Sequence, residues 1–494
     1  MSILAIDAGT TGVTALVVSS GAAVLARGYA EFPQHFPREG WVEHEPGDIW
    51  QATLTAVGQA LDALGPDGEP PTAVGITNQR ETVVLWDRET LGSPRRAIVW
   101  QDRRTAGICE QLRADGNEPR VTELTGLRLD PYFSATKLTW VRLNEPHVWA
   151  QVESGRVAVG TVDSYLVARL TRGLHHLTDA SNASRTLLYD IHEGQWSDEL
   201  CALFHVPREA LPEVVASYGV VARTDPASFL GLDLPIAGIA GDQQAALFGQ
   251  ACFSPGTSKC TYGTGSFVLV NTGERPVPSA NGLLTTVAWQ HPDGRLTYAL
   301  EGAVFVTGAA VQWLRDGLQI IGSAAETEEL ARSVPDSGGV VFVPALTGLG
   351  APDWDPHARG TILGLSRGTT RAHIVRATLE AIAFEVRDVV DLMVHEGGVT
   401  MPELAVDGGA SANGFLCQVQ ADTLQVPVVR AGILETTGLG AALLAGLGTG
   451  VWASPEDIAG VVRRDARFEP GAADEHARRR WRVAVERSKS WATV

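Results

Sequence analysis

The chain has 494 residues, which exceeds the size at which a single hydrophobic core stops growing, so we expect two domains. Hydrophobic residues make up 45% of the sequence and charged residues 19%, a balance that excludes an intrinsically disordered chain. The net charge of −18 argues against partners such as nucleic acid or an anionic membrane surface, because both require a basic binding surface.

No segment of the sequence predicts secretion or membrane insertion. The five cysteines contain no C-x-x-C pair, which argues against a zinc site or a disulfide framework and for a reducing compartment. The N-terminal residues lack a basic region and reach Asp7 too early for a signal peptide. The apolar stretch at 438–452 is glycine-rich and shorter than the ~20 residues that span a bilayer, so we expect a buried helix there. We therefore expect a cytoplasmic protein.

The first predicted element is a β-hairpin with a carboxylate at its mouth. Apolar residues 3–6 precede Asp7, a glycine- and threonine-containing turn follows at 8–12, and a second apolar run occupies 15–18. Strand-like segments at 73–76, 82–86 and 156–159 then mix with helix-like segments such as 50–64. This mixture is typical of an α/β protein.

A second hairpin of similar design lies in the middle of the chain. A strand of small residues at 234–241 reaches Asp242 and is followed by a helix-like run at 243–249. The hairpin comes next, with strands at 257–262 and 267–270 around the turn Gly263-Thr264-Gly265. Two such hairpins suggest two related halves. We expect an N-terminal domain of residues 1–248 and a C-terminal domain of residues 249–494.

The second half also contains a long helix and a further glycine-rich turn. An apolar stripe predicts a core-packing helix from 370 to about 394, which two glycines end at 397 and 398. The strand 404–406 then meets Asp-Gly-Gly-Ala-Ser-Ala-Asn at 407–413. Because glycines let the backbone approach a flat or anionic ligand at the start of a helix, this turn is a third candidate contact for a nucleotide.

Phosphate binding here cannot rest on a P-loop, because none of the three lysines follows a glycine, and G-x-G-x-x-G is also absent. The two hairpin turns can form another cradle, since turn amides bind anions, although a single glycine turn is usually only a turn. Asp7 and Asp242 stand at the ends of predicted strands, where α/β sheets bind ligands. Either could instead be a cap or an ion-pair partner. In phosphoryl transfer one would hold Mg²⁺ and the other would accept the proton of the attacking hydroxyl.

One motif favours a different chemistry. Gly364-Leu-Ser366-Arg-Gly368 matches the G-x-S-x-G nucleophile elbow of α/β-hydrolases. A hydrolase also needs a later acid and a base, and the histidines downstream are His373, His395 and His476. His395 stands at the end of a predicted helix, where a capping role explains it. We expect Ser366 to be a loop residue ahead of that helix.

Longer motifs resemble a known family. They are Gly-Ile-Thr-Asn-Gln-Arg-Glu-Thr at 75–82, Asp-Pro-Tyr-Phe-Ser at 130–134 and Gly-Ile-Ala-Gly-Asp-Gln-Gln at 238–244, with further segments at 98–105, 261–265, 301–305, 348–352 and 360–380. Together they closely resemble the glycerol-phosphorylating members of the FGGY carbohydrate kinase family over nearly the whole chain. The resemblance implies an α/β actin-like ATPase fold, in which two ribonuclease-H-like domains close around a central cleft. It also implies ATP-dependent phosphorylation of glycerol to sn-glycerol 3-phosphate, and a homodimer or homotetramer.

The resemblance carries the family's substrate-binding residues onto this sequence. It implies that polyol hydroxyls are held by Arg80, Glu81, Tyr132, Asp242 and Gln243, and that the carbon backbone packs against Trp100 and Phe267. Guanidinium donors with carboxylate and amide acceptors suit a triol. The resemblance further makes Asp242 the general base of an in-line transfer and places Asp7 and Asp242 at the Mg²⁺ ion.

The resemblance also implies the nucleotide contacts for ATP. They are Thr10, Thr11, Gly12 and Thr14 in the first hairpin, Thr264 and Gly265 in the second, Gly308 and Gln312 beyond it, and Gly409 with Asn413 near the adenosine. The first hairpin departs from the family pattern, since Ala8, Gly12 and Thr14 stand where Gln, Ser and Arg are usual. Loss of that arginine removes a charge-assisted phosphate contact, so we expect weaker binding of ATP.

Two alternatives stay open. Another kinase of the same fold could phosphorylate a different polyol or ketose, such as erythritol, xylulose or ribulose. An actin-like ATPase that acts as a regulator or chaperone would share the phosphate-binding hairpins, but it would have no reason to keep the five hydroxyl-binding residues together.

Overall fold

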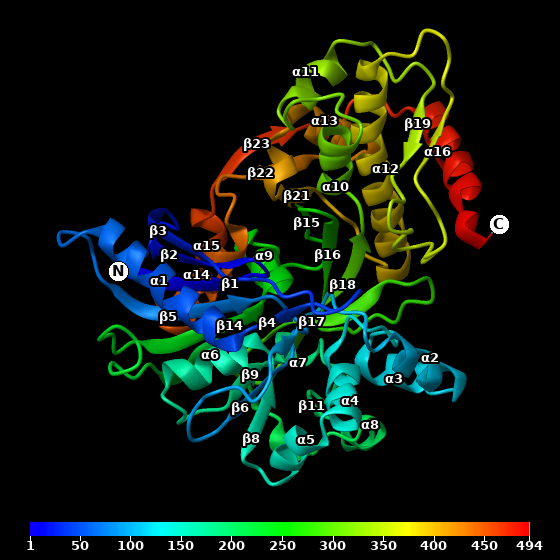
Figure 1. Ribbon diagram of the computed structural model, residues 1–494. Helices are drawn as coiled ribbons and strands as arrows, with labels where there is room; N and C mark the ends of the chain where they lie inside the picture. The colour runs from blue at the N-terminus through cyan, green and yellow to red at the C-terminus, as the bar shows by residue number, and fades with distance from the viewer. Residues whose placement is uncertain (494) are drawn as a thin grey trace.

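The computed structural model describes residues 1–493 and is built on two large mixed β-sheets (Figure 1). The first sheet has the strand order β13-β14-β5-β1-β2-β3, and the second has the order β17-β18-β16-β15-β21-β22-β23. The first comprises β1 (Ser2–Ala8), β2 (Gly12–Ser19), β3 (Val24–Glu31), β5 (Pro71–Asn78), β13 (Tyr218–Arg223) and β14 (Pro235–Gly241). The second comprises β15 (Ser258–Tyr262), β16 (Ser266–Gly273), β17 (Leu284–Gln290), β18 (Leu296–Val304), β21 (Leu404–Asp407), β22 (Val428–Ala431) and β23 (Arg464–Phe468).

Shorter strands pair in twos away from the large sheets. They are β4 (Glu43–His44) with β7 (Ala97–Ile98), β6 (Val84–Asp87) with β8 (Val157–Gly160), β9 (Leu177–Asp179) with β12 (Glu213–Val215), β10 (Tyr189–Asp190) with β11 (Gln195–Trp196), and β19 (Val341–Val343) with β20 (Thr361–Leu363). The predicted strands at 73–76, 82–86 and 156–159 correspond to β5, β6 and β8.

Helices cover both sheets. Those of the first half are α1 (Pro46–Leu64), α2 (Ala106–Ala114), α3 (Glu118–Thr125), α4 (Ser134–Asn144), α5 (Pro146–Glu153), α6 (Val162–Leu170), α7 (Ala180–Ala183) and α8 (Asp198–Phe204). Then follow α9 (Asp242–Gly249), α10 (Gly308–Gln312), α11 (Glu326–Arg332), α12 (Arg371–Gly397), α13 (Gly414–Leu424), α14 (Thr436–Gly448), α15 (Pro455–Val461) and α16 (Glu475–Ser488). Short helical turns are η1 (Arg208–Ala210), η2 (Trp313–Gly317), η3 (Gly409–Ala412) and η4 (Trp491–Thr493).

The two large sheets repeat one topology. In the first, β1, β2 and β3 pair antiparallel, whereas β1, β5 and β14 run parallel. In the second, β15, β16 and β18 repeat the antiparallel part, and β15, β21 and β22 repeat the parallel part. Both predicted hairpins are therefore present, and the expectation of two related halves is confirmed at the level of strand order.

Helices α9 and α14 contribute to a hydrophobic core that both sheets share. This core joins apolar residues of β1 and β2 to others of β16, β18 and β21. Glycines allow the close packing, because a Cβ on Gly440 would lie 1.8 Å from the carbonyl oxygen of Ala245, and one on Gly75 would lie 2.0 Å from that of Ala441. The apolar stretch is thus a buried helix up to Gly448, as predicted, and residues 449–452 lie beyond its end. Within residues 1–493, none of the helices combines the length and apolar character needed to cross a bilayer.

A lobe of residues 106–204 lies below the first sheet in Figure 1 and carries α2 to α5 and α8. It has its own core, to which the second sheet contributes Leu284, Val287 and Tyr298 from strands β17 and β18. The hydroxyl of Tyr298 donates to the carbonyl of Ile191 at 2.6 Å. The β17–β18 edge of the second sheet is therefore anchored on the first half of the chain.

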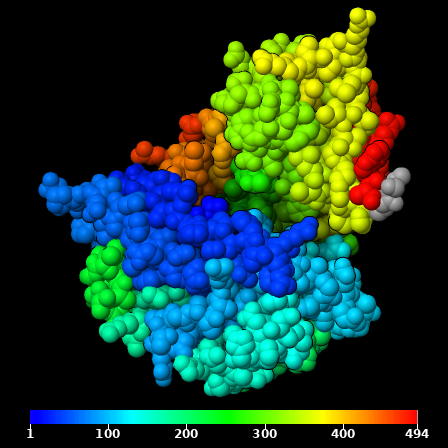
Figure 2. All heavy atoms as spheres, in the orientation of Figure 1, coloured from blue at the N-terminus to red at the C-terminus, as the bar shows by residue number. Residues whose placement is uncertain are grey.

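Opposite this lobe, α10 to α13, α16 and β19 form the upper part of the molecule (Figure 1). In Figure 2 the surface is notched where the blue N-terminal region meets the green and yellow upper part. Ser366 lies exposed between β20 and α12 with no strand leading directly into it, which agrees with its prediction as a loop residue. His395 lies in the last turn of α12, next to the left-handed Gly398.

Candidate active site

The strongest candidate residues meet at one edge of the first sheet. Strands β1, β5 and β14 run parallel, so Asp7, Arg80 with Glu81, and Asp242 all lie at or just beyond their carboxyl ends. Burial and, to a smaller extent, the negative charge of Asp242 together raise the pKa of the Asp7 carboxyl to about 7. Burial also raises the pKa of Asp242. The two carboxylates thus lie close enough for the charge of Asp242 to oppose the ionisation of Asp7.

Arg80 lies at the centre of this group and is almost completely buried. Its Nε lies 3.0 Å from Oδ1 of Asp242, and its Nη2 donates to the hydroxyl of Tyr132 at 3.4 Å. Its Nη1 lies 2.6 Å from Oε2 of Glu301, a residue of strand β18. A guanidinium with several donors in fixed directions can hold all three partners at once.

Glu81 and Arg185 extend the group into a buried network. Glu81 has a φ of +63°, a conformation rare for residues other than glycine, and it lies 1% exposed. Its Oε1 lies 2.7 Å from Nε of Arg185, whose Nη2 lies 2.9 Å from Oε1 of Glu301. Burial opposes ionisation of Glu301, but Arg185 and Arg80 together lower its pKa to about 2. Two arginines and two glutamates therefore form a buried network of alternating charges next to Asp242.

The sequence motifs predict no role for Arg185 or Glu301, although Glu301 begins one of the resembling segments. A signal was available in strand β18, where Glu301 follows Ala-Leu and precedes Gly-Ala-Val. Because a charged residue in an apolar strand is rarely buried without a partner, Glu301 indicates an ion pair. Its partners come from 116 and 221 residues away in the sequence, which no local pattern reveals.

Aromatic residues form one wall of the site. The rings of Trp100 and Tyr132 lie edge to face with their centroids 5.5 Å apart. The indole Nε1 of Trp100 donates to the hydroxyl of Thr10 at 3.0 Å, so a predicted substrate residue contacts a predicted nucleotide residue. Phe267 lies on β16 opposite Thr261 and packs half-buried against the core that the two sheets share.

Asp242 and Gln243 open helix α9 directly after strand β14. The Asp242 side chain is 32% exposed, and its Oδ1 accepts from the backbone N–H of Gln243 at 2.7 Å as well as from Arg80. The side-chain carbonyl of Gln243 accepts a hydrogen bond from the ammonium of Lys259 on β15. The five predicted hydroxyl-binding residues thus come from three separate segments and gather at one place.

Neighbouring side-chain and backbone groups hold the two hairpin turns. In the first turn, the carbonyl of Thr10 accepts from the amide of Gln34 at 2.8 Å, Thr11 is exposed, and a Cβ on Gly12 would lie 2.7 Å from the carbonyl of Ala30. Thr14 stands opposite Asp7 in the β1–β2 register. This places Thr14 on the same face of the hairpin as the carboxylate.

The second turn rests on the start of α10. The carbonyls of Gly263 and Thr264 accept from the N–H groups of Gly308 and Ala309, each at 3.0 Å. A Cβ on Gly308 would lie 2.6 Å from the carbonyl of Gly263, so only glycine allows this approach. A Cβ on Gly265 would lie 2.4 Å from the carbonyl of Val304. The structure therefore brings Thr264, Gly265 and Gly308 together, with Gln312 exposed at the end of α10.

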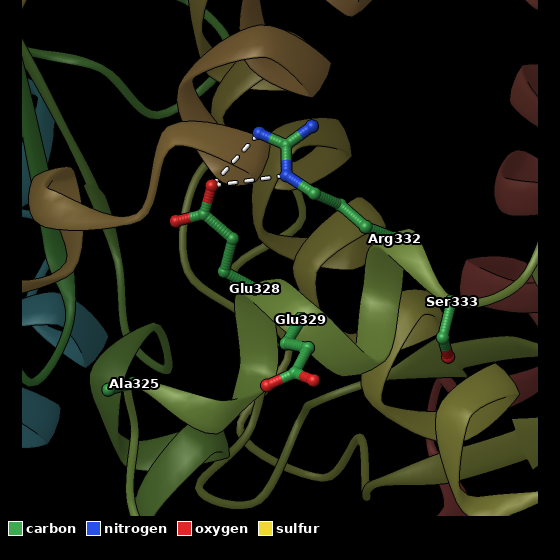
Figure 3. A pocket seen from close by; sticks show the side chains of 5 residues that line it. All are labelled: Ala325, Glu328, Glu329, Arg332 and Ser333. Atoms are coloured by element: carbon green, nitrogen blue, oxygen red, sulfur yellow. Dashed lines mark hydrogen bonds and ion pairs between the residues drawn. The ribbon is translucent and has the colours of Figure 1, made fainter.

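The third candidate segment lies in the upper part of the molecule. Gly409 begins η3, and Asn413 caps α13 by accepting from the N–H of Leu416 at 3.0 Å. The side-chain amide of Asn413 donates to the hydroxyl of Thr327 on α11 at 3.0 Å. An open surface pocket lies along this helix, lined by Ala325, Glu328, Glu329, Arg332 and Ser333 (Figure 3). Figure 3 shows Glu328 paired with Arg332, and its second oxygen accepts from the N–H of Gly414 at 3.0 Å.

The residues at the sheet edge suit a cation only in part. Among residues 1–493, no group of three or more His, Cys, Asp and Glu side chains is arranged to hold a metal without other ligands. Asp7 and Asp242 are two carboxylates whose mutual repulsion a cation would relieve. Mg²⁺ commonly takes one or two carboxylates and completes its shell with water and substrate phosphate, so the pair fits such an ion.

Most of the chain matches two domains of one known protein family. The N-terminal domain of the FGGY family of carbohydrate kinases matches residues 2–249, and its C-terminal domain matches residues 258–449. The chain belongs to the FGGY family of carbohydrate kinases. Its membership confirms the resemblance and identifies the protein as a kinase.

This FGGY kinase is similar to curated relatives over nearly its whole length. It is 52% identical to glycerol kinase 2 of Thermotoga maritima, with 99% of each chain covered. It is 53% identical to the glycerol kinase of Deinococcus radiodurans, with 99% of this chain and 98% of that protein covered.

Solved structures confirm the fold of the FGGY kinase. The crystal structure of Plasmodium falciparum glycerol kinase with ADP superposes with a TM-score of 0.93 at 34% identity, covering 99% of this chain and 98% of that one. The xylulose kinase from Rhodospirillum rubrum superposes with a TM-score of 0.86 at 26% identity, covering 98% and 97%. The expected actin-like fold with two ribonuclease-H-like domains is therefore confirmed.

Proposed function

We propose that this FGGY kinase transfers the γ-phosphoryl group of ATP to glycerol and forms sn-glycerol 3-phosphate. The observation that carries the proposal is the gathering of Arg80, Glu81, Tyr132, Asp242 and Gln243 at one sheet edge. Donors and acceptors alternate there, as a triol requires. Relatives named glycerol kinase, at 52% and 53% identity over nearly the whole chain, support glycerol as the substrate. The related structure solved with ADP supports an adenine nucleotide.

In this proposal Asp242 is the general base. Both of its hydrogen-bond partners, Arg80 Nε and the N–H of Gln243, engage Oδ1, which leaves Oδ2 for the substrate. Oδ2 takes the proton of the terminal hydroxyl while that oxygen attacks the γ-phosphorus in line and ADP departs. Burial raises the pKa of Asp242, and this favours the role because a base works best when its pKa approaches the working pH.

Asp7, together with Asp242, would hold Mg²⁺, which neutralises charge on the phosphates when it is bound. Asp7 needs to be ionised for this, and its pKa of about 7 leaves it poised between the two forms before a cation arrives. The position of Asp7 at the end of β1, opposite Thr14 of the first phosphate hairpin, supports the assignment.

For ATP, we propose that the two hairpin turns hold the phosphates from the two halves of the chain. Thr10, Thr11, Gly12 and Thr14 act from the first half, and Thr264 and Gly265 act from the second. Gly308 and Gln312 would lie along the nucleotide, and Gly409 with Asn413 would contact the adenosine. The bond between Trp100 and Thr10 supports a nucleotide next to the polyol, since it joins the two sets of residues. The domain boundary between residues 248 and 249 likewise remains our proposal.

A substrate panel tests the proposal against its alternatives. The wild type is incubated with Mg²⁺, ATP and, separately, glycerol, erythritol, ribitol, xylulose and dihydroxyacetone, and ADP release is followed. We expect the highest kcat/KM for glycerol. Faster turnover of another acceptor would make the protein a kinase for that compound. Binding of ATP without turnover of any acceptor would favour a regulatory actin-like ATPase.

A further inference from the structure

Lys259 is a buried lysine to which the proposed mechanism assigns no role. It lies in strand β15 with no solvent exposure and is one of only three lysines in 494 residues. Burying an ammonium group is unfavourable, and a methionine of similar length would fill the same space without that penalty. A lysine at this position therefore requires an explanation from its contacts.

The ammonium of Lys259 has two hydrogen-bond acceptors. One is the side-chain carbonyl Oε1 of Gln243, and the other is the hydroxyl of Thr261 at 2.9 Å. Burial lowers the pKa of the Lys259 amine, and the charges of Asp407, Glu301 and Asp242 at longer range oppose that effect in part. Lys259 thus links the start of helix α9 to strand β15 in the second sheet.

The chemistry of this contact fixes the orientation of the Gln243 amide. An ammonium group only donates hydrogen bonds, whereas a glutamine amide has one accepting and one donating end. With Lys259 in place the accepting Oε1 must face the ammonium, so the donating Nε2 faces away from it. A glutamine with no such partner can exchange its two ends by rotation, and it would present either one.

We propose that Lys259 is a positioning residue that holds Gln243 with its Nε2–H₂ group directed at a hydroxyl oxygen of the substrate. This inference rests on the proposed function, and it makes that hydroxyl an acceptor toward Gln243. An acceptor substrate lacking this oxygen leaves the Nε2 donors unpaired and is rejected. Lys259 itself does not touch the reacting atoms.

A double-mutant cycle in the full chain tests this role. We expect Lys259→Met to raise the KM for glycerol by about tenfold, the value of one neutral hydrogen bond, while the KM for ATP changes less than twofold. The preference for glycerol over propane-1,2-diol or propane-1,3-diol should fall by a similar factor. In a Gln243→Ala background, Lys259→Met should change the KM for glycerol less than twofold. Additive effects of the two changes would overturn the proposal, because a purely structural lysine would act independently of Gln243.

A milder variant covers the case in which Lys259→Met fails to fold. Thr261→Val removes the second acceptor of Lys259 at nearly constant volume, and we expect a two- to threefold rise in the KM for glycerol that disappears in the Gln243→Ala background. A rise that persists in that background would contradict the proposal. The cycle uses whichever acceptor of the panel the wild type phosphorylates best. Preference for another acceptor would overturn the proposed substrate, whereas additivity would overturn the role of Lys259.

Discussion

Oε2 of Glu301 lies 2.6 Å from Nη1 of Arg80, and this buried ion pair joins strand β18 of the second sheet to the segment after β5 of the first. Arg185 approaches the other oxygen of Glu301 to 2.9 Å. All three side chains are at most 2% exposed, so no water replaces a missing partner. The candidate substrate site is therefore built across both halves of the molecule.

Removing the charge of Glu301 should destabilise the protein. Glu301→Gln leaves Arg80 and Arg185 buried with less compensating charge, and breaking a buried ion pair lowers the free energy of unfolding by roughly 3–5 kcal/mol. We also expect a higher KM for glycerol, since Arg80 loses one of its anchors. Urea denaturation and steady-state kinetics measure the two effects. Glu274→Gln, at an exposed pair with Arg295, is the matched control and should change stability by less than about 0.5 kcal/mol. Equal effects of both variants would contradict the account.

The crossing of α9 and α14 should not tolerate a methyl group. Gly440→Ala would place a Cβ 1.8 Å from the carbonyl oxygen of Ala245, so the helices must separate. We expect a loss of stability of at least 1–3 kcal/mol, as for overpacked cores. Gly58→Ala in α1 meets no atom within 4 Å and should stabilise the protein by about 0.5–1 kcal/mol. Thermal denaturation of the two variants checks this, and a neutral Gly440→Ala would show that the helices do not pack this closely.

Asp7 should make stability depend on pH in a defined direction. Its pKa rises from 3.8 in the unfolded chain to about 7 in the folded one, so the folded state holds a proton that the unfolded state loses. The resulting loss of stability begins above pH 4 and is complete above pH 7. Asp7→Asn removes this loss, so we expect it to raise the melting temperature more at pH 8 than at pH 5.

Asp87 is a suitable control for Asp7, because folding lowers its pKa, whereas folding raises that of Asp7. The N–H of Thr90 and the side chain of Arg156 lower its pKa to about 2. Its stabilising effect is complete at both pH 5 and pH 8, because both values lie above its folded and its unfolded pKa. We therefore expect Asp87→Asn to lower the melting temperature equally at the two pH values. A pH-independent effect of Asp7→Asn would contradict the assignment for Asp7.

The first hairpin should bind ATP more tightly when its missing charge is restored. Thr14 faces the same side of the hairpin as Asp7, and an arginine there could reach a phosphate. Hydrogen bonds to charged groups contribute roughly 1.5–3 kcal/mol, so we expect Thr14→Arg to lower the KM for ATP by about tenfold or more. Thr55→Arg, on the exposed side of α1, adds the same charge elsewhere and should leave that KM unchanged. An unchanged KM in Thr14→Arg would show that Thr14 does not face the phosphates.

Much of the fold could be predicted from the sequence because its elements are locally encoded. The β1–β2 and β15–β16 hairpins carry glycine turns between apolar strands, and α12 shows a helical stripe that ends at glycines. The packing of α14 against the first sheet and α9 could not be predicted in this way. It depends on glycines at 75, 238 and 440, which become close contacts only when distant segments meet.

In the candidate site, too, residues in local sequence patterns could be predicted, and residues that depend on distant contacts could not. Asp7 and Asp242 are predictable because each stands at the end of a strand, and Arg80, Glu81 and Tyr132 because they stand in long motifs. The partners Glu301, Arg185 and Lys259 are not predictable, since their significance lies in ion pairs and hydrogen bonds across the fold. Each is a charged residue with at most 1% exposure, and such burial is known only once the chain is folded.

The most direct test of the account is the rate of sn-glycerol 3-phosphate formation by wild type and Asp242→Asn at saturating Mg-ATP and glycerol. We expect the wild type to form the product and kcat to fall by a factor on the order of 10²–10⁴ in Asp242→Asn. Asp163→Asn, at a fully buried carboxylate that accepts from Thr161 and Thr178, is the control and should keep most of the activity. An Asp242→Asn variant that retains more than a tenth of the wild-type kcat would contradict the role of Asp242 as general base.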